Sequence, residues 1–251
     1  MSTQAPSAAR QAMRTVWSPK NVLVAVDFGE ASARAVGVAG IIASTFGARL
    51  IAVHAERFDP PPYFTLEQIA RLEAERRAGQ AVVTAHLVQF ALKETSYPIT
   101  VAISDEPPVD AILHAAANAE LIVIGTHGRR GPGRWWLGSV AERVVRAATV
   151  PVLVTRAGTP PRDLFERIAI VGDDAGDASA GRTMANQLAE VFSGHVVHAG
   201  PAAHCQPELM AQASLVVMET SGGHPAWAMS DSVAKILGSC QRPVLFIPKV
   251  K

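Results

Sequence analysis

The sequence has few of the features of a secreted or membrane-spanning protein. Only two of its 251 residues are cysteines, Cys205 and Cys240, and they form no C-x-x-C pair. This spacing excludes a disulfide framework and a cysteine-rich zinc site, and it is typical of a protein of the reducing cytoplasm. No run of about 18 uncharged apolar residues occurs, so we expect no membrane span. The sequence therefore predicts a cytoplasmic protein.

An excess of charge of one sign is lacking as well. The chain has 23 Lys and Arg residues against 22 Asp and Glu residues, which gives a formal net charge of +1. No global field is available to hold nucleic acid or an anionic membrane, so any anion site must be local. Because 49% of the residues are hydrophobic and 18% charged, the chain can build one large core or two smaller ones.

Short β-branched runs alternate with helical patterns through the first part of the chain. The expected strands are residues 21–27, 49–54, 99–103, 121–124 and 151–154. The expected helices are residues 32–46, a long helix capped by Thr65 that ends before Pro98, and residues 109–118 and 139–148. Strands that are apolar on both faces are typical of a parallel sheet covered on two sides. We predict the α/β class, with an open five-stranded sandwich of the Rossmann-like type.

From Arg167 the pattern begins again, so the chain contains an internal repeat. The second copy has its own acidic turn, Asp173-Asp174, and is shorter by a helix or more. One expected strand begins at residue 167, and three more cover residues 196–197, 215–218 and 243–247. The first helix of this copy covers about 179–192. The predicted division is a flexible arm at 1–20, a first domain at 21–157, a linker at 158–165 and a degenerate second domain at 166–251. An organelle transit peptide is the alternative for the basic arm.

The most informative segment is Gly125-Thr-His-Gly128, followed after nine residues by Gly138-Ser139. It lies between a buried strand and the start of a helix. At this edge of an open α/β sheet ligands bind in a crevice, and the free N–H groups of the helix favour an anion. Glycines let the backbone approach phosphate closely, and Ser139 can both cap the helix and donate its hydroxyl. This pattern predicts a nucleotide site.

Charged residues flank this segment. The loop between the glycines holds Arg129, Arg130 and Arg134 and no acid, which complements a polyphosphate; the alternative is that these side chains only keep the loop soluble. Asp27 ends the first strand beside a helix start. It either contacts the nucleotide or a metal carried by it, or caps the helix and does nothing more.

These motifs resemble the universal stress protein family. The resemblance rests on residues 26–32, on 122–128 followed by Gly138-Ser139, and on the strand 151–154. It covers the chain from about residue 20 as a tandem pair, strongly in the first copy and weakly in the second. It implies two open parallel five-stranded α/β sandwiches, the second shorter and degenerate, and an ATP-binding stress-response or regulatory module.

The resemblance also implies which residues bind ATP. Adenine would lie at the ends of the first two strands, on Ala25, Val26, Asp27 and Val53. Phosphates and ribose would lie on Ile124, Gly125, Gly128, Arg129, Gly138, Ser139 and Val140. Many ATP-binding members carry a second hydroxyl where this chain has Ala141, which predicts lower affinity. The only metal expected is a Mg²⁺ ion that accompanies the nucleotide at Asp27, since His195 and His198 would point to opposite faces of a strand.

The second copy differs at the positions that would bind phosphate. Aligning Met218 with Ile124 places Glu219 at the position of Gly125 and Asp231 at that of Gly138. Two carboxylates would repel a polyphosphate strongly. We therefore predict one ATP per chain, in the first half.

Three functions remain open at this point: an ATP-holding module, a slow ATPase or phosphotransfer enzyme, and a nucleotide-free scaffold. No Ser-His-Asp order, paired-carboxylate motif or Walker lysine supports strong catalysis. The intact glycines argue against the scaffold. We also expect strand 151–154 to meet strand 243–247 in an intramolecular pseudo-dimer, with a homodimer of whole chains as an open alternative. No nucleic-acid or membrane partner is expected.

Overall fold

The structure is a computed structural model, and it describes residues 17–56, 63–126, 137–160, 163–171, 179–200, 207–220 and 242–248. Strands and helices alternate through the first half, as the sequence predicts. Its elements are β1 Asn21–Ala25, α1 Glu30–Phe46, β2 Arg49–Ala55, α2 Leu66–Glu94, β3 Ile99–Ser104, α3 Pro108–Ala115, the 3₁₀ turn η2 Ala116–Asn118, β4 Leu121–Thr126, α4 Ser139–Ala147 and β5 Val152–Arg156.

The second half repeats this order in shorter form. Its elements are β6 Arg167–Val171, α5 Ala180–Phe192, β7 His195–Gly200, α6 Pro207–Gln212, β8 Leu215–Thr220 and β9 Val244–Pro248. Only residues 201–206 separate β7 from α6, too few for counterparts of α2 and β3. Within the described residues the second half thus contributes four strands, in agreement with the prediction that this half is shorter.

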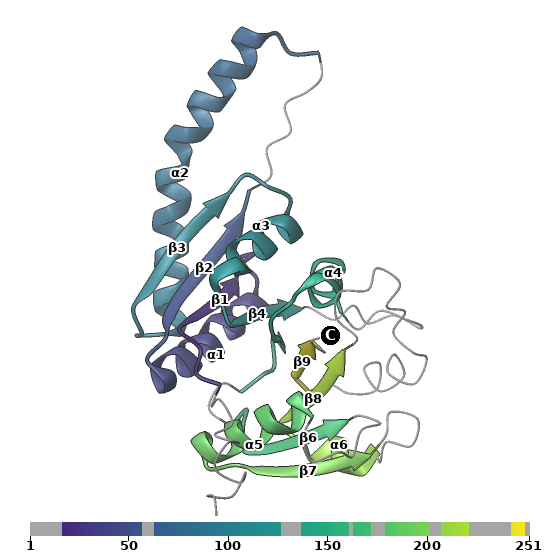
Figure 1. Ribbon diagram of the computed structural model, residues 1–251. Coiled ribbons are helices and arrows are strands. Elements are labelled where there is room, and N and C mark those ends of the chain that lie inside the picture. Colours follow the sequence, from purple (N-terminus) through teal and green to yellow (C-terminus); the bar gives the residue numbers. More distant parts are fainter. Residues whose placement is uncertain are drawn as a thin grey trace, which may run out of the picture.

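The strands of both halves join in one nine-stranded sheet, in the order β3-β2-β1-β4-β5-β9-β8-β6-β7 (Figure 1). The pair β5 and β9 is antiparallel, with Leu153 opposite Leu245, and the other described pairs are parallel. The α/β class is therefore confirmed. The last strands of the two halves share a ladder of backbone hydrogen bonds, as expected, and this ladder joins the strands of both halves into one sheet.

Both faces of this sheet are buried. On β1, Val22 and Val24 pack in the core layer that contains α1 and α5, while Leu23 and Ala25 pack in the layer that contains α3 and α4. A strand that is buried on both faces has a continuous apolar sequence, which is why the apolar run at 21–27 located β1 correctly.

Local end signals fix two of the helices. Gly47 ends α1 in the left-handed conformation, with φ of 66°, which glycine adopts without steric cost. Thr65 begins α2 with a capping box: its hydroxyl accepts from the Gln68 amide, and the Gln68 side chain accepts from the Thr65 amide. Both ends agree with the sequence prediction.

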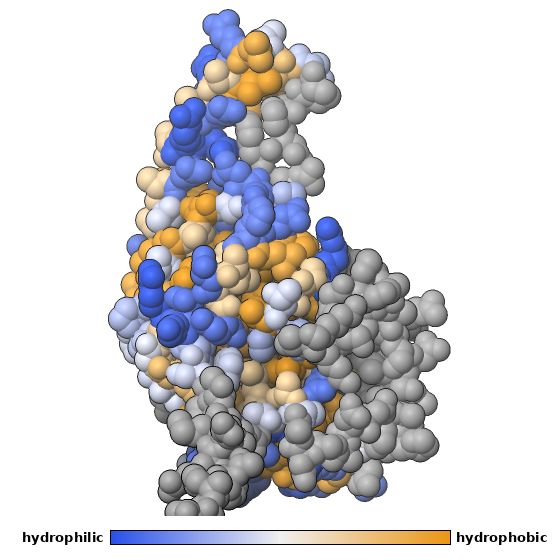
Figure 2. Space-filling model, viewed as in Figure 1, coloured by the Kyte–Doolittle hydropathy of each residue, from blue (hydrophilic) through white to orange (hydrophobic). Residues whose placement is uncertain are grey.

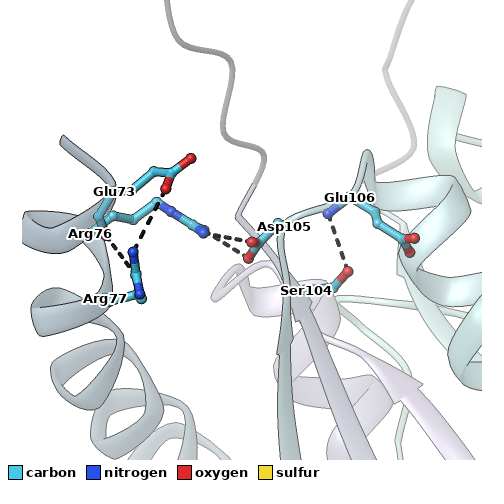
Figure 3. A network of polar contacts seen from close by, with 6 residues as sticks. All are labelled: Glu73, Arg76, Arg77, Ser104, Asp105 and Glu106. Atoms are coloured by element: carbon cyan, nitrogen blue, oxygen red, sulfur yellow. Dashed lines mark hydrogen bonds and ion pairs between the residues drawn. The ribbon is translucent and has the colours of Figure 1, made fainter. Parts of the chain in front are cut away.

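Helix α2 extends well beyond the sheet it covers (Figure 1). Only Leu87 and Ala91 of its 29 residues are buried. Farther toward its N-terminus, Arg76 forms a two-pronged ion pair with Asp105 at 2.7 and 2.5 Å, just after β3 (Figure 3). The hydrogen bond from Arg76 holds the pKa of Asp105 below its ordinary value. Apolar side chains gather at the tip of the projection (Figure 2), and Leu66, the first residue of α2, is 87% exposed.

The segments next to the first domain also contact the folded core. Trp17, within the predicted arm, packs edge-on against Phe46 of α1, and its amide donates to the Gln187 side chain of α5 at 2.8 Å. Leu164 and Phe165, within the predicted linker, are buried. Residues on both sides of the first domain thus help to join the two halves.

Candidate functional site

A cavity of about 700 Å³ lies at the carboxyl ends of β1, β2 and β4, bounded by α3 and by the start of α4. Its volume is within the range of small-ligand sites. This edge is where ligands bind in open parallel α/β sheets. The lining residues are Ala25, Val26, Asp27, Ser32, Val53, His54, Ala55, Pro108, Ile112, Ile124, Gly125, Thr126, Leu137, Gly138, Ser139, Val140, Ala141 and Glu142.

The structure brings together the predicted site residues that it describes. Four come from the ends of β1 and β2, two from the end of β4, and three from the start of α4. These residues are Ala25, Val26, Asp27, Val53, Ile124, Gly125, Gly138, Ser139 and Val140. Gly128 and Arg129 lie outside the described residues. For the whole predicted set, including the residues that line the cavity, the role of contacting a ligand remains a prediction.

Asp27 shapes the turn that leads from β1 into α1. Its Oδ1 atom accepts a hydrogen bond from the amide of Gly29 at 2.9 Å, and its side chain is exposed. Gly29 is the N-cap residue of α1, which has no side-chain capping bond. The alternative that Asp27 is the helix cap is therefore wrong, although its carboxylate does order the N-cap backbone.

Gly125 is required by packing as well as by its place in the motif. A Cβ atom at this position would lie 2.3 Å from the carbonyl carbon of Ala31 and 2.6 Å from the amide nitrogen of Ser32. The start of α1 therefore lies directly against the end of β4. Only a residue without a side chain fits between them, so this glycine lets β4 and α1 form adjoining walls of the cavity.

The start of α4 differs from the prediction in one respect. Gly138 is its N-cap residue, and no side chain caps the helix. Ser139 is the first helical residue and is exposed, so the expected capping role of Ser139 is wrong. The first bond within the helix runs from the amide of Glu142 to the carbonyl of Gly138, at 2.9 Å.

Several lining residues were missed by the sequence reasoning. Thr126, next to Gly125, accepts the Gly138 amide on its hydroxyl at 3.0 Å. Glu142 lines the cavity but is paired with Arg146 at 2.5 Å, which offsets its charge. A hydroxyl at the end of a strand that enters a glycine motif was a usable signal for Thr126.

His54, at the edge of the sheet, is another lining residue that the sequence reasoning missed. His54 lines the cavity and bonds through Nδ1 to the carbonyl oxygen of Val26 at 2.8 Å. Because a carbonyl can only accept, Nδ1 carries the proton in this bond. The ring lies 4.6 Å from the ring of Phe28, which in turn stacks on His86 of α2. His54 therefore ties the ends of β1 and β2 together.

The corresponding strand end in the second half is arranged differently. Glu219, aligned with Gly125, directs its carboxylate to the start of α5 and accepts from the Gly181 amide at 2.6 Å. Gly181 makes this approach feasible, since a Cβ there would lie 2.9 Å from the Glu219 side chain. Asp231 lies outside the described residues.

Other kinds of site find little support in the described residues. His198 bonds to Arg182 at 2.7 Å, and no group of three or more metal-binding side chains occurs in the ranges that the structure describes. Within the same part of the chain, no helix combines the length and apolar character needed to cross a bilayer.

The fold and the cavity define a Rossmann-like α/β protein with a ligand-sized site at the carboxyl edge of its sheet. The model of the universal stress protein family matches residues 19–156, more than half of the chain. The chain therefore belongs to the universal stress protein family.

Relatives and solved structures agree with this assignment. A universal stress protein from Thermus aquaticus is 37% identical over 140 residues, covering 55% of this chain and 98% of the relative. One from Mycobacterium tuberculosis is 35% identical over 142 residues, covering 54% of this chain. The match covers 45% of that relative, so the chain spans about half its length. The crystal structure of a universal stress protein from Archaeoglobus fulgidus superposes over 92% of this chain and 99% of its own, with a TM-score of 0.65 and 15% identity. This likeness shows the shared fold across both halves.

Proposed function

We propose that this protein is an ATP-binding stress-response module with one nucleotide site, in its N-terminal half. The observation that carries the proposal is the convergence of nine predicted residues from three strand ends and one helix start on a single cavity. These are residues that the family resemblance implies, and they are spread between positions 25 and 140 of the chain.

The chemistry of the cavity suits a nucleotide. Its β1–β2 end is lined by Ala25, Val26 and Val53, apolar side chains that suit a purine ring. Its α4 end offers the start of a helix, where backbone N–H groups and the helix dipole favour phosphate. The exposed carboxylate of Asp27 lies in the same cavity and fits a Mg²⁺ ion carried in with the phosphates.

The second half is proposed to bind no ATP. Its Glu219 carboxylate lies at the strand end that corresponds to Gly125, and it would face the polyphosphate with like charge. The antiparallel ladder between β5 and β9 supports the further proposal that the two halves form an intramolecular pseudo-dimer.

Calorimetric titration of the whole chain with ATP and MgCl₂ tests the proposal. We expect saturable binding with one site per chain. Mass spectrometry of the nucleotide after a long incubation separates the module from the slow enzyme: intact ATP supports the module, whereas ADP with released phosphate supports the enzyme. Absence of any nucleotide binding would favour the scaffold and refute the proposal.

A further inference from the structure

Thr126 forms a bond that links the two ends of the glycine segment. It is the last residue of β4, where it pairs with Arg156 of β5, and it is 4% exposed. Its Oγ1 atom accepts from the amide of Gly138, twelve residues later, at 3.0 Å. This bond joins the N-cap of α4 to the end of β4.

The start of α4 has amides that lack a partner within the helix. The first bond within the helix uses the amide of Glu142, so the helix leaves the amides of Ser139, Val140 and Ala141 without a partner inside it. All three residues line the cavity. The amide of Gly138, in contrast, already donates to Thr126.

We propose that Thr126 is a positioning residue for the phosphates: it takes up the Gly138 amide and thereby aims the next three amides of α4 into the cavity. This inference rests on the proposed ATP-binding function. It gives Gly138 a different role from the one that the family resemblance implies. The amide of Gly138 donates to Thr126 instead of to the nucleotide, and an added Cβ there would make an ordinary contact of 3.4 Å with Thr126 Oγ1.

Replacing Thr126 by valine tests the role, because valine keeps the shape and removes the hydroxyl. Helix α4 stays anchored by buried residues farther along it, Ala141, Val144 and Val145. The matched control is Thr159→Val, since Thr159 is also 4% exposed, its hydroxyl also accepts from a backbone amide, that of Arg156 at 2.9 Å, and it does not line the cavity.

We expect Thr126→Val to weaken ATP binding by about tenfold while leaving the affinity for adenosine unchanged. Thr126→Ser should restore ATP binding, and Thr159→Val should change neither affinity. A structural role alone would lower the affinities for ATP and adenosine together, or would lower only the melting temperature. Either of those outcomes, or unchanged ATP affinity in Thr126→Val, overturns the inference.

A measurement on the unmodified protein does not depend on how the variants fold. In ¹⁵N-labelled protein, ATP should shift the amide signals of Ser139, Val140 and Ala141 more than that of Gly138. A larger shift at Gly138 would overturn the inference while leaving ATP binding intact. If the unmodified protein shows no binding and no shifts, the proposed function fails and the inference falls with it.

Discussion

Replacement of Gly138 by aspartate is the most direct test of the phosphate site. The change places a carboxylate at the N-cap of α4, beside the amides proposed to bind phosphate. The backbone tolerates a side chain there: Gly138 has φ of −57°, and its added Cβ would make an ordinary contact of 3.4 Å with Thr126. Aspartate is also a favourable N-cap residue, so the fold should be as stable as before or slightly more so.

The expected loss of affinity follows from simple electrostatics. A carboxylate about 5 Å from a phosphate, at an effective dielectric constant of about 20, adds about 3 kcal/mol of repulsion. This corresponds to a loss of affinity on the order of a hundredfold. The new carboxylate also accepts from the amides of the first turn of α4, which would otherwise be free for the nucleotide.

Calorimetry with two ligands and two control variants separates these effects. Gly138→Asp should abolish most ATP binding and spare much of the adenosine binding, since adenosine carries no charge. Gly138→Ala should retain ATP binding, because it adds only the Cβ atom. Gly158→Asp adds the same charge at an exposed position with open space around it. Unchanged ATP affinity in Gly138→Asp would place the phosphates elsewhere and refute the site.

Three further predictions concern the site and its frame. Titration with ATP should give one site per chain, and two equivalent sites would contradict the proposed effect of Glu219. Gly125→Ala should lower the free energy of unfolding, measured in urea, by about 1–3 kcal/mol, because the Cβ of the alanine would overlap the Ala31 backbone. An unchanged midpoint of unfolding would contradict this contact. Asp105 has a lowered pKa through its bond to Arg76, so the stabilisation that it gives is present above about pH 4 and is lost as the pH falls through the lowered value. The protection factors of the α2 amides, which correct the exchange rates for the intrinsic effect of pH, should then fall in acid, and Asp105→Asn should remove this dependence; equal pH dependence in both proteins would refute it.

The sequence predicted best those features that short segments determine. The buried run at 21–27 located β1 because a strand covered on both faces is apolar throughout. Thr65 marked the start of α2 because capping depends on residues within one turn.

Features that depend on contacts between distant segments were missed or given the wrong reason. The bond between Thr126 and Gly138 joins residues twelve positions apart, and nothing in the spacing shows which donor the hydroxyl meets. The unpaired edges of open sheets suggested that β5 and β9 meet, but they could not show that the pairing makes one continuous sheet.

Glycine at position 125 shows why a correct motif was given an incomplete explanation. The motif was interpreted as backbone left open for phosphate, whereas the structure shows that a side chain there would strike the start of α1. In the second half the corresponding residues are Glu219 at the strand end and Gly181 at the helix start. Compared with Gly125 and Ala31 in the first half, the side chain lies on the strand residue and the glycine lies on the helix. The same close approach of strand and helix is thus kept with the glycine on the opposite partner. Because the carboxylate of Glu219 then binds the Gly181 amide, the helix start gains a fixed anion of its own. The change that keeps the packing therefore also places negative charge at the sheet edge, which gives a physical reason to expect the two halves to differ in nucleotide binding despite their shared fold.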